Sequence, residues 1–529
     1  MRNLPIFKCM KIKKIDPDKL TYIFVNADGS DERVTYRDIF EQTNRLSHLL
    51  LNAGIGRGDT FTLIMRNYPE FIYALFAALS IGAIAVPIDP RSKGDKLAFQ
   101  INNTKSKAIL ISDEFIGSIQ EIQDKIADVQ IAGVLYKAHH QIPETEGWPS
   151  LARLMAKSSP TLPNKLAPYS KKNPVQIIHT SGTTGDPKGV VLRADRFRSY
   201  ALLNKLVWKY KKDDVLYTGL SMTHGNAQAV TVLPALADSD LVAVVSEKFT
   251  KSKIWDICRK YNCTTFSLLG GMMAGIFNEP PKANDGDNPV RRVISAGTPR
   301  AIWEDFENRF GVQIHEWYAA IEGGLAHNPP RKKRPIGSFG RPNPIIYRMK
   351  IVDDNDQEVP AGERGELISR MTFGSTKVNY FGKKKESSEK TRGGWLRSGD
   401  ICHKDEQGNL YFDFRKGGGL RRQGDFIQPD FVERVVGEHE SISEACVYGI
   451  PASSGAPGES DIVVAVVPFN GDGVDLDGVR QLCRQKLEAN SFPSYFQLVD
   501  DIPKSSSEKH LARLLKDVFS PDAENVVTF

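Results

Sequence analysis

Apolar positions recur at helical spacing in some segments and form short continuous runs in others. These two patterns predict helices that alternate with strands. From residue 34 to residue 53 apolar side chains recur at helical spacing, with Thr35 as a candidate N-cap, Asp38 three residues later and Gly54 at the end. Short apolar runs predict strands at 61–65, 83–87, 108–112 and 131–136, with helices at 69–81 and 115–127. Because strands that alternate with helices usually pair in parallel, this part is predicted to form an α/β core.

The alternation continues through the middle of the chain. Helices are expected at 197–209, 255–261 and 301–310, and strands at 215–220, 241–245, 264–268, 292–295 and 312–314. Residues 138–172 carry five prolines and little periodicity, so a loop-rich segment is expected there. The most apolar stretch, 71–86, contains Ser80 and Gly82 and stops at Pro87, which indicates a buried helix and strand rather than a membrane span.

A run of three glycines precedes the last part of the chain. Residues 395–415 have the pattern of a β-hairpin with a turn at 405–409, and Lys416 is followed by Gly417 and two further glycines. Because consecutive glycines make a flexible backbone, we expect a domain boundary here, between residues 1–415 and residues 416–529. Beyond it, helices at 429–438 and 474–487 and strands at 445–448 and 462–468 predict a small α+β domain.

Composition and charge exclude several classes of protein. A chain of 529 residues with 40% hydrophobic and 25% charged residues is typical of a globular enzyme with at least two domains. The net charge of +6 is small, and the basic runs at 331–334 and 383–385 indicate solvated loops or a local attraction for phosphate groups, so no nucleic-acid partner is expected. The six scattered cysteines predict neither a zinc site nor disulfides, and no signal peptide is evident, which favours a cytoplasmic location.

The strongest chemical signal lies between the apolar runs 175–178 and 190–192. Glycines there allow backbone N–H groups to converge, while hydroxyl groups and a lysine add donors and positive charge, so the segment is suited to holding a polyphosphate. It is not the common P-loop, because Gly189 rather than Ser or Thr follows the lysine. A flexible surface loop is the alternative. The candidate phosphate ligands are Thr180, Ser181, Gly182, Thr183, Thr184, Gly185 and Lys188.

This string resembles the phosphate loop of the adenylate-forming superfamily, which contains acyl-CoA synthetases, peptide-synthetase adenylation domains and luciferases. Segments 295–299, 316–322, 397–400 and 502–509 agree with that superfamily in type and order, and 281–287, 309–312 and 334–341 resemble its crotonobetaine/carnitine–CoA ligase-like branch. The resemblance implies a large N-terminal α/β domain of stacked mixed sheets with flanking helices, joined by a hinge to the small domain. It also implies an ATP-dependent acyl-CoA synthetase that works through an acyl-adenylate, with domain rotation between the half-reactions.

The resemblance assigns roles to individual residues. Lys509 is expected to bridge the substrate carboxylate and the α-phosphate, Glu322 to bind Mg²⁺, and His224 to line the acyl pocket, although a lone histidine is more often structural. Gly424 is expected to admit the pantetheine of coenzyme A, and Lys416 and Gly417 to form the hinge. The remaining nucleotide contacts are expected from Gly297, Thr298, Pro299, Trp317, Tyr318, Asp400 and Arg415.

The sequence also departs from the superfamily pattern, at Ala319, Ile321, Gly417 and Glu508. Two alternatives therefore stay open: a stand-alone adenylating enzyme that loads a carrier protein, and a catalytically weakened binding or regulatory homologue. ATP, Mg²⁺ and coenzyme A are the expected cofactors, and a small carboxylic acid is the expected substrate. The sequence specifies neither the acid nor the oligomeric state, and a homodimer is one open case.

Overall fold

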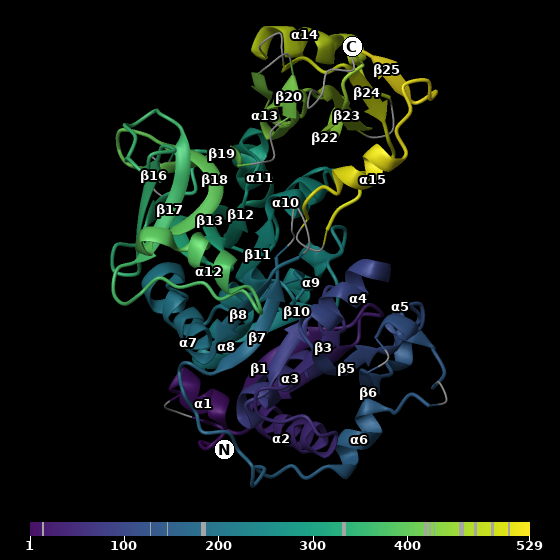
Figure 1. Ribbon diagram of the computed structural model, residues 1–529, viewed down its shortest axis with the longest axis vertical. Helices are drawn as coiled ribbons and strands as arrows, with labels where there is room; N and C mark the ends of the chain where they lie inside the picture. Colours follow the sequence, from purple (N-terminus) through teal and green to yellow (C-terminus); the bar gives the residue numbers. More distant parts are fainter. Residues whose placement is uncertain are drawn as a thin grey trace.

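The structure is a computed structural model that describes residues 1–12, 15–126, 128–144, 147–180, 187–330, 335–416, 420–422, 425–427, 429–453, 460–469, 473–487, 491–505 and 508–529. Two large sheets form the body of the molecule, a smaller sheet flanks them, and a separate layer of strands and helices sits on top (Figure 1). Among the described residues, no helix combines the length and the apolar character needed to cross a bilayer.

The first large sheet has six strands in the order β6-β5-β3-β4-β7-β8. Its strands are parallel except for the last pair, β7 and β8, which is antiparallel. The bounds are β3 (Thr60–Ile64), β4 (Ile84–Pro87), β5 (Ser106–Ser112), β6 (Gln130–Leu135), β7 (Pro174–His179) and β8 (Gly189–Arg193). The expected α/β core is therefore confirmed in this half of the body.

The second large sheet has nine strands in the order β15-β14-β13-β12-β11-β9-β10-β1-β2. Its central strands are parallel, and antiparallel pairs close both edges. The bounds are β1 (Leu20–Val25), β2 (Asp31–Thr35), β9 (Val215–Thr218), β10 (Val242–Ser246), β11 (Thr265–Leu269), β12 (Arg292–Ala296), β13 (Gln313–Ala320), β14 (Gly323–Asn328) and β15 (Arg341–Pro342). The pairing of β1 with β10 was not expected, because the two strands lie far apart along the chain.

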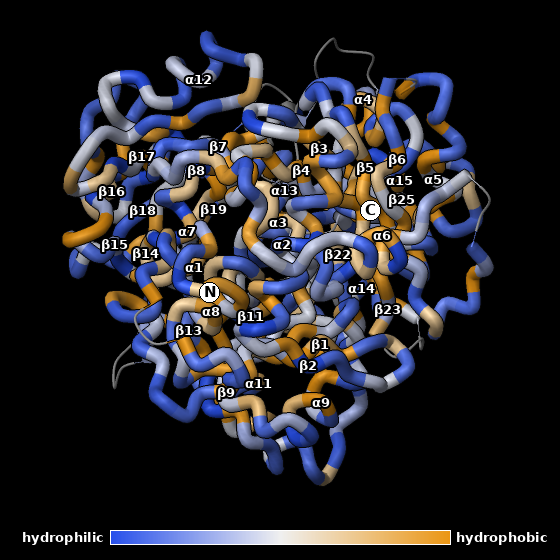
Figure 2. Tube along the Cα trace, turned by 90° about the horizontal axis from the view of Figure 1, so that it is seen from below, coloured by the Kyte–Doolittle hydropathy of each residue, from blue (hydrophilic) through white to orange (hydrophobic). Residues whose placement is uncertain are grey.

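Helices cover and separate the two large sheets. They are α1 (Pro5–Met10), α2 (Tyr36–Asn52), α3 (Pro69–Ile81), α4 (Gly94–Asn103), α5 (Ile116–Gln120), α6 (Leu151–Lys157), α7 (Ala194–Leu203), α8 (Leu233–Ala237), α9 (Ile254–Lys260), α10 (Gly270–Phe277) and α11 (Trp303–Phe310). Helix α3 is buried on almost every side, and it shares one core with residues from both sheets. Figure 2 shows the hydrophobic segments gathered inside the body and the hydrophilic ones around its rim.

Two helix predictions were wrong in detail. The segment 115–127 is broken into a 3₁₀ turn, the short helix α5 and a second 3₁₀ turn, and Ala127 lies outside the described residues. Gly117 and the β-branched isoleucines lower its helix propensity, although Ile116, Ile119 and Ile122 still face the core. Conversely, α6 forms inside the segment expected to be loop, because Leu151 and Met155 bury one short apolar face.

The smaller part of the molecule carries its own hydrophobic core, centred on Val432, Val464 and Phe496. A four-stranded sheet of order β22-β23-β24-β25 is flanked by α13 (Pro429–Val436), α14 (Leu476–Lys486) and α15 (Ala512–Asp517). The strands are β22 (Ile442–Pro451), β23 (Ser460–Pro468), β24 (Tyr495–Leu498) and β25 (Val526–Thr528). The fold is therefore a large N-terminal domain of mixed sheets with a smaller C-terminal domain.

Between the two parts along the chain comes an antiparallel sheet of order β16-β17-β18-β19, which lies beside the body (Figure 1). Its strands are β16 (Tyr347–Val352), β17 (Gly365–Met371), β18 (Leu396–Lys404) and β19 (Leu410–Arg415), and α12 (Lys384–Lys390) crosses between β17 and β18. The expected hairpin over 395–415 is β18 and β19. A short pair, β20 (Leu420–Arg422) and β21 (Asp425–Ile427), follows it.

Candidate active site

The predicted phosphate loop starts and ends on paired strands. His179 lies opposite Gly189 in the antiparallel pair, and the Thr180 N–H donates to the Lys188 carbonyl at 2.9 Å. Gly189 must be small, because a Cβ there would come within 2.7 Å of Ile177 Cγ2. The two strands predicted on either side of the loop are confirmed as β7 and β8, whereas residues 181–186, and with them Ser181 to Gly185, lie outside the described residues.

Tyr380 joins the loop lysine to the predicted magnesium ligand. The segment 379–381 runs beside β8, since the Val191 N–H donates to the Asn379 carbonyl at 2.8 Å. Lys188 Nζ lies 5.4 Å from the centre of the Tyr380 ring, and the Tyr380 hydroxyl donates to Glu322 Oε1 at 3.0 Å. Sequence reasoning missed Tyr380, because no motif surrounds it.

Glu322 sits in a two-residue turn rather than in an open loop. Strand β13 continues to Ala320 and β14 starts at Gly323, so only Ile321 and Glu322 separate the two strands. The strand predicted at 312–314 is therefore longer than expected, and Ala319 occupies an irregularity in its pairing with β14. The Arg196 guanidinium donates to the Ile321 carbonyl at 3.0 Å, which fixes the turn.

Ile321 is the departure that changes the surface of the site. A Cβ at Gly225 would lie 3.0 Å from Ile321 Cδ1, so the isoleucine packs directly beside the turn that contains His224. The superfamily pattern has a threonine here. An apolar side chain, which offers no hydroxyl to a phosphate, therefore separates the Glu322 turn from the His224 turn.

Glu316 ties the segment 295–299 to β13. Its carboxylate accepts hydrogen bonds from the Gly297 N–H at 2.6 Å and from the Thr298 hydroxyl at 2.5 Å. Burial raises the pKa of Glu316 to about 7, although these hydrogen bonds act in the opposite direction. Glu316 was not predicted as a site residue, yet it sets the position of Gly297, Thr298 and Pro299.

Tyr318 and Asp400 meet on the same side of β13. The Tyr318 hydroxyl donates to Asp400 Oδ2, and the Tyr318 ring stacks on Phe339 with a centroid distance of 4.8 Å. Burial raises the pKa of Tyr318, and the charge of Asp400 adds to this effect, so the hydroxyl keeps its proton and acts as a donor. The structure thus brings Tyr318 and Asp400, which belong to separate sequence motifs, into direct contact.

Trp317 points the other way. Side chains alternate along a strand, so its indole lies on the face of β13 opposite to that of Glu316 and Tyr318. It packs edge-on against Trp208 at 5.2 Å and is only 6% exposed. The ring is therefore part of the core, and the expectation that Trp317 contacts the nucleotide stays a prediction.

His224 and Lys509 come together from the two domains. The Asn226 N–H donates to His224 Nδ1 at 3.2 Å, which places the proton of the neutral ring on Nε2. Burial, with a smaller contribution from the positive charge of Lys509, lowers the pKa of His224 to about 4. In Figure 1 the segment next to α15 reaches down towards α10, and Glu508 packs there, 3.3 Å from the position of a Cβ on Gly271.

The backbone around Lys509 forms a tight turn. The Ser505 N–H donates to the Lys509 carbonyl at 2.7 Å, and the Lys509 N–H donates to Ser505 Oγ at 3.1 Å. Glu508 stands where the superfamily pattern has glycine, and its φ of 56° lies in the left-handed region. That conformation costs a residue with a Cβ roughly 1–2 kcal/mol.

Besides Ser181 to Gly185, further predicted residues are not fully placed. Gly417 and Gly424 lie outside the described residues, as does the side chain of Arg415. Lys416 is placed: its N–H donates to the Gly399 carbonyl at 2.7 Å, and its Nζ lies 3.0 Å from Asp354 Oδ1.

Comparisons with known proteins identify the family of the chain. A family model described as AMP-binding enzyme matches residues 13–374, and one described as AMP-binding enzyme C-terminal domain matches residues 432–509. A crotonobetaine/carnitine–CoA ligase from Salmonella enteritidis PT4 is 28% identical over 505 residues, which cover 94% of this chain and 96% of the relative.

Solved structures share the fold at low identity. The anthranilate CoA ligase AuaEII in complex with anthranoyl-AMP has a TM-score of 0.82 at 19% identity, over 97% of this chain and 96% of that one. A benzoate CoA ligase from Burkholderia xenovorans LB400 has a TM-score of 0.82 at 19% identity, over 97% and 99%.

Proposed function

The chain belongs to the AMP-binding enzyme family, and from this premise we propose that it is an AMP-forming acyl-CoA synthetase. It joins a carboxylic acid to coenzyme A with the use of ATP and releases AMP and pyrophosphate. The observation that carries the proposal is the contact between the two domains beside Lys509: Glu508, the residue before it, packs against Gly271 of the N-terminal domain. The charge of Lys509 also contributes to the lowered pKa of His224.

The chemistry explains why two lysines are needed. A carboxylate is a poor acyl donor, because its leaving group is an oxide. A carboxylate oxygen therefore attacks the α-phosphate of ATP, forms an acyl-adenylate and displaces pyrophosphate, and a thiolate then attacks the acyl carbon and displaces AMP. Lys188 holds the outgoing phosphates, and Lys509 balances the charge on the carboxylate and the α-phosphate. Tyr318 and Asp400 orient the nucleoside.

The residues present also fit a magnesium ion. Carboxylate oxygens are hard donors of the kind that Mg²⁺ prefers, and Glu322 supplies one beside Tyr380 and Lys188. A bound Mg²⁺ would supply charge neutralisation on the polyphosphate. The contribution of the chain is to hold the carboxylate in one orientation, which the Tyr380 hydroxyl does.

Domain rotation belongs to the same proposal. Lys509 and an incoming thiol would need the same space, so the domain 416–529 turns about Lys416 and Gly417, relative to 1–415, before the second half-reaction. In the rotated state Gly424 lines the path of pantetheine. The six free cysteines, all buried, support a cytoplasmic location.

Pyrophosphate release tests the proposal. Purified protein is mixed with ATP, Mg²⁺ and a panel of carboxylic acids that starts with crotonobetaine and carnitine, the acids in the relative's name. Release with at least one acid, followed by thioester formation with coenzyme A, is expected. Transfer to a holo-carrier protein but not to coenzyme A would favour the carrier-loading alternative. ATP binding without pyrophosphate release from any acid would favour the weakened homologue.

A further inference from the structure

His510, the residue after Lys509, turns away from the active site and into the C-terminal domain. Its Nε2 lies 2.9 Å from Glu444 Oε1, and its Nδ1 lies 3.8 Å from Glu433 Oε1. The two glutamates belong to different elements, Glu433 to α13 and Glu444 to β22. The imidazole is therefore held between two carboxylates of the domain core, and it is only 25% exposed.

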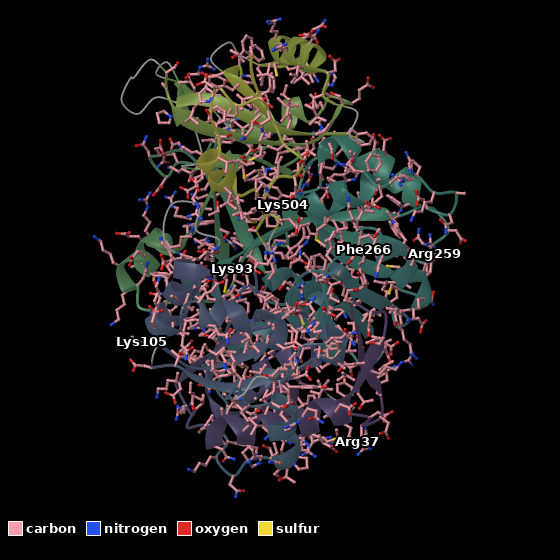
Figure 3. All side chains as sticks on the ribbon, turned by 90° about the vertical axis from the view of Figure 1, so that its right-hand side faces the viewer. Arg37, Lys93, Lys105, Arg259, Phe266 and Lys504 are labelled. Carbon is pink, nitrogen blue, oxygen red and sulfur yellow. The ribbon has the colours of Figure 1, made fainter. Side chains whose placement is uncertain are left out.

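Lys504 completes the arrangement from the other side of the turn. Its Nζ lies 2.7 Å from Glu444 Oε2, so the two oxygens of Glu444 each meet one cation. Lys504 and His510 face each other across a β-bridge, and the Leu511 N–H donates to the Pro503 carbonyl at 2.7 Å. Figure 3 places Lys504 at the level where the C-terminal domain meets the body. We call residues 503–505 and 508–511 the lysine loop.

The charges of this cluster support one another. Burial alone would lower the pKa of His510, but its bonds to Cys446, Glu433 and Glu444 raise that pKa to about 12. Burial raises the pKa of Glu444, yet His510 and Lys504 together bring it below its ordinary value. The ion pairs are thus charge-assisted and partly buried, the class in which loss of one partner is most costly.

The lysine loop also contains a strained residue. Glu508 adopts a left-handed conformation, and it directly precedes Lys509. A loop with an unfavourable φ needs other contacts to keep its shape. The residue that provides these contacts is His510, two positions after Glu508. It ties the loop to α13 and β22.

We propose that His510 is a positioning residue: its ion pairs with Glu433 and Glu444 fix the base of the lysine loop and thereby the place of Lys509. This inference rests on the proposed role of Lys509 in adenylate formation. His510 acts through Lys509, since its own imidazole faces Glu433 and Glu444. Because displacement of a catalytic group by about 1 Å can cost ~100-fold in rate, loss of the anchor is expected to affect the first half-reaction selectively.

The test separates the two half-reactions in the full-length chain. His510→Leu removes the charge, His510→Gln keeps a polar group, and His510→Arg keeps the charge and two donors. His439→Leu is the matched control, since His439 is also a histidine of this domain but bonds to Ser441. Pyrophosphate exchange reports adenylation, and transfer from a supplied acyl-adenylate to coenzyme A reports the second step.

For His510→Leu and His510→Gln we expect adenylation to fall by ~100-fold, while transfer from the acyl-adenylate stays near the wild-type rate. His510→Arg restores most of the adenylation rate, and His439→Leu changes neither step. An equal fall in both steps, or no fall in adenylation, overturns the proposal. If His510→Leu does not fold, the two half-reactions are compared between His510→Gln and wild type.

Hydrogen exchange makes the test independent of the substrate. In the ligand-free full-length protein, peptides that contain residues 508–511 are expected to exchange faster in His510→Gln than in wild type, with peptides of β22 unchanged. Unchanged exchange at 508–511 overturns the anchor even if the enzyme is active. Absence of pyrophosphate release by the wild-type protein with every acid would instead contradict the proposed function and leave the exchange result valid.

Discussion

Two loops bring a lysine to the candidate site, and the protein holds them by different means. The phosphate loop leaves and re-enters a pair of strands, and a main-chain hydrogen bond between Thr180 and Lys188 closes it. Main-chain hydrogen bonds also close the lysine loop, but side-chain charges, those of Lys504 and His510 on Glu444, attach it to β22. Main-chain anchoring tolerates substitution of side chains, whereas an anchor of charges fails when one group is removed.

The first prediction removes the lysine that enters from the C-terminal domain, and it should have the largest effect. Lys509→Ala is expected to reduce adenylate formation by orders of magnitude, since charge stabilisation by a preorganised group is often the largest catalytic contribution. Thioester formation from a supplied acyl-adenylate should continue. The two steps are measured separately, and equal loss of both would contradict the assignment of Lys509.

The second prediction removes the other lysine. Lys188→Ala is expected to lower kcat/KM for ATP by about 100-fold, because one electrostatic contact to the phosphates is lost. The melting temperature should hardly change, because the hydrogen bond that closes the loop uses the Lys188 carbonyl. Calorimetry of wild type and variant checks this, and a large fall in melting temperature would show that Lys188 is structural.

The third prediction concerns pH and the meeting point of the two domains. The pKa of His224 is lowered to about 4, so between pH 6.5 and 4 the unfolded chain binds a proton that the folded chain does not. Stability is therefore lost as pH falls through this window. His224→Asn should lose less stability between pH 6.5 and pH 4.5 than wild type does.

Thermal unfolding at the two pH values measures this difference. The control is His48→Asn, which alters a histidine of α2 far from Lys509. If His224→Asn and wild type lose the same stability, the imidazole is not kept neutral by its surroundings.

The smallest effect is expected for the strained residue of the lysine loop. Glu508→Gly should stabilise the protein by up to about 1 kcal/mol, because relief of the left-handed strain exceeds the entropic cost of glycine. Glu440→Gly is the matched control: this exposed residue has no such strain, and the change should destabilise by about 0.5–1 kcal/mol. Chemical denaturation measures the free energy of unfolding of both variants. If both substitutions change it in the same direction, the strain at Glu508 is refuted.

Sequence periodicity located elements best where local chemistry marks both ends. Helix α3 has the predicted bounds, because Pro69 suits the first helical turn and Gly82 adopts the left-handed conformation that ends it. Helix α2 carries the predicted capping box of Thr35 and Asp38. The segment 115–127 has no such marks, and there a regular apolar spacing did not produce a continuous helix.

The site could be predicted where its residues belong to one string, and not where they meet across the fold. Tyr380 reaches Glu322 from 58 positions away, so nothing in the local pattern identifies it. Glu316 and Trp317 lie inside a recognised string, but their roles depend on which face of β13 they occupy. The period of two along that strand would have placed Glu316 with Tyr318 and Trp317 in the core.

Because β1 pairs with β10, the first strand is synthesised long before one of its two neighbours in the sheet. Tyr22 lies opposite Ala243, so the partner of the first strand is made about 220 residues later. At ~5–20 residues per second, the apolar strand waits on the order of 10–40 s before its partner leaves the ribosome. Meanwhile β2 covers only one of its edges, and the other is a template for pairing with another chain. The nascent protein is therefore expected to need a chaperone most in the interval before residue 246 emerges.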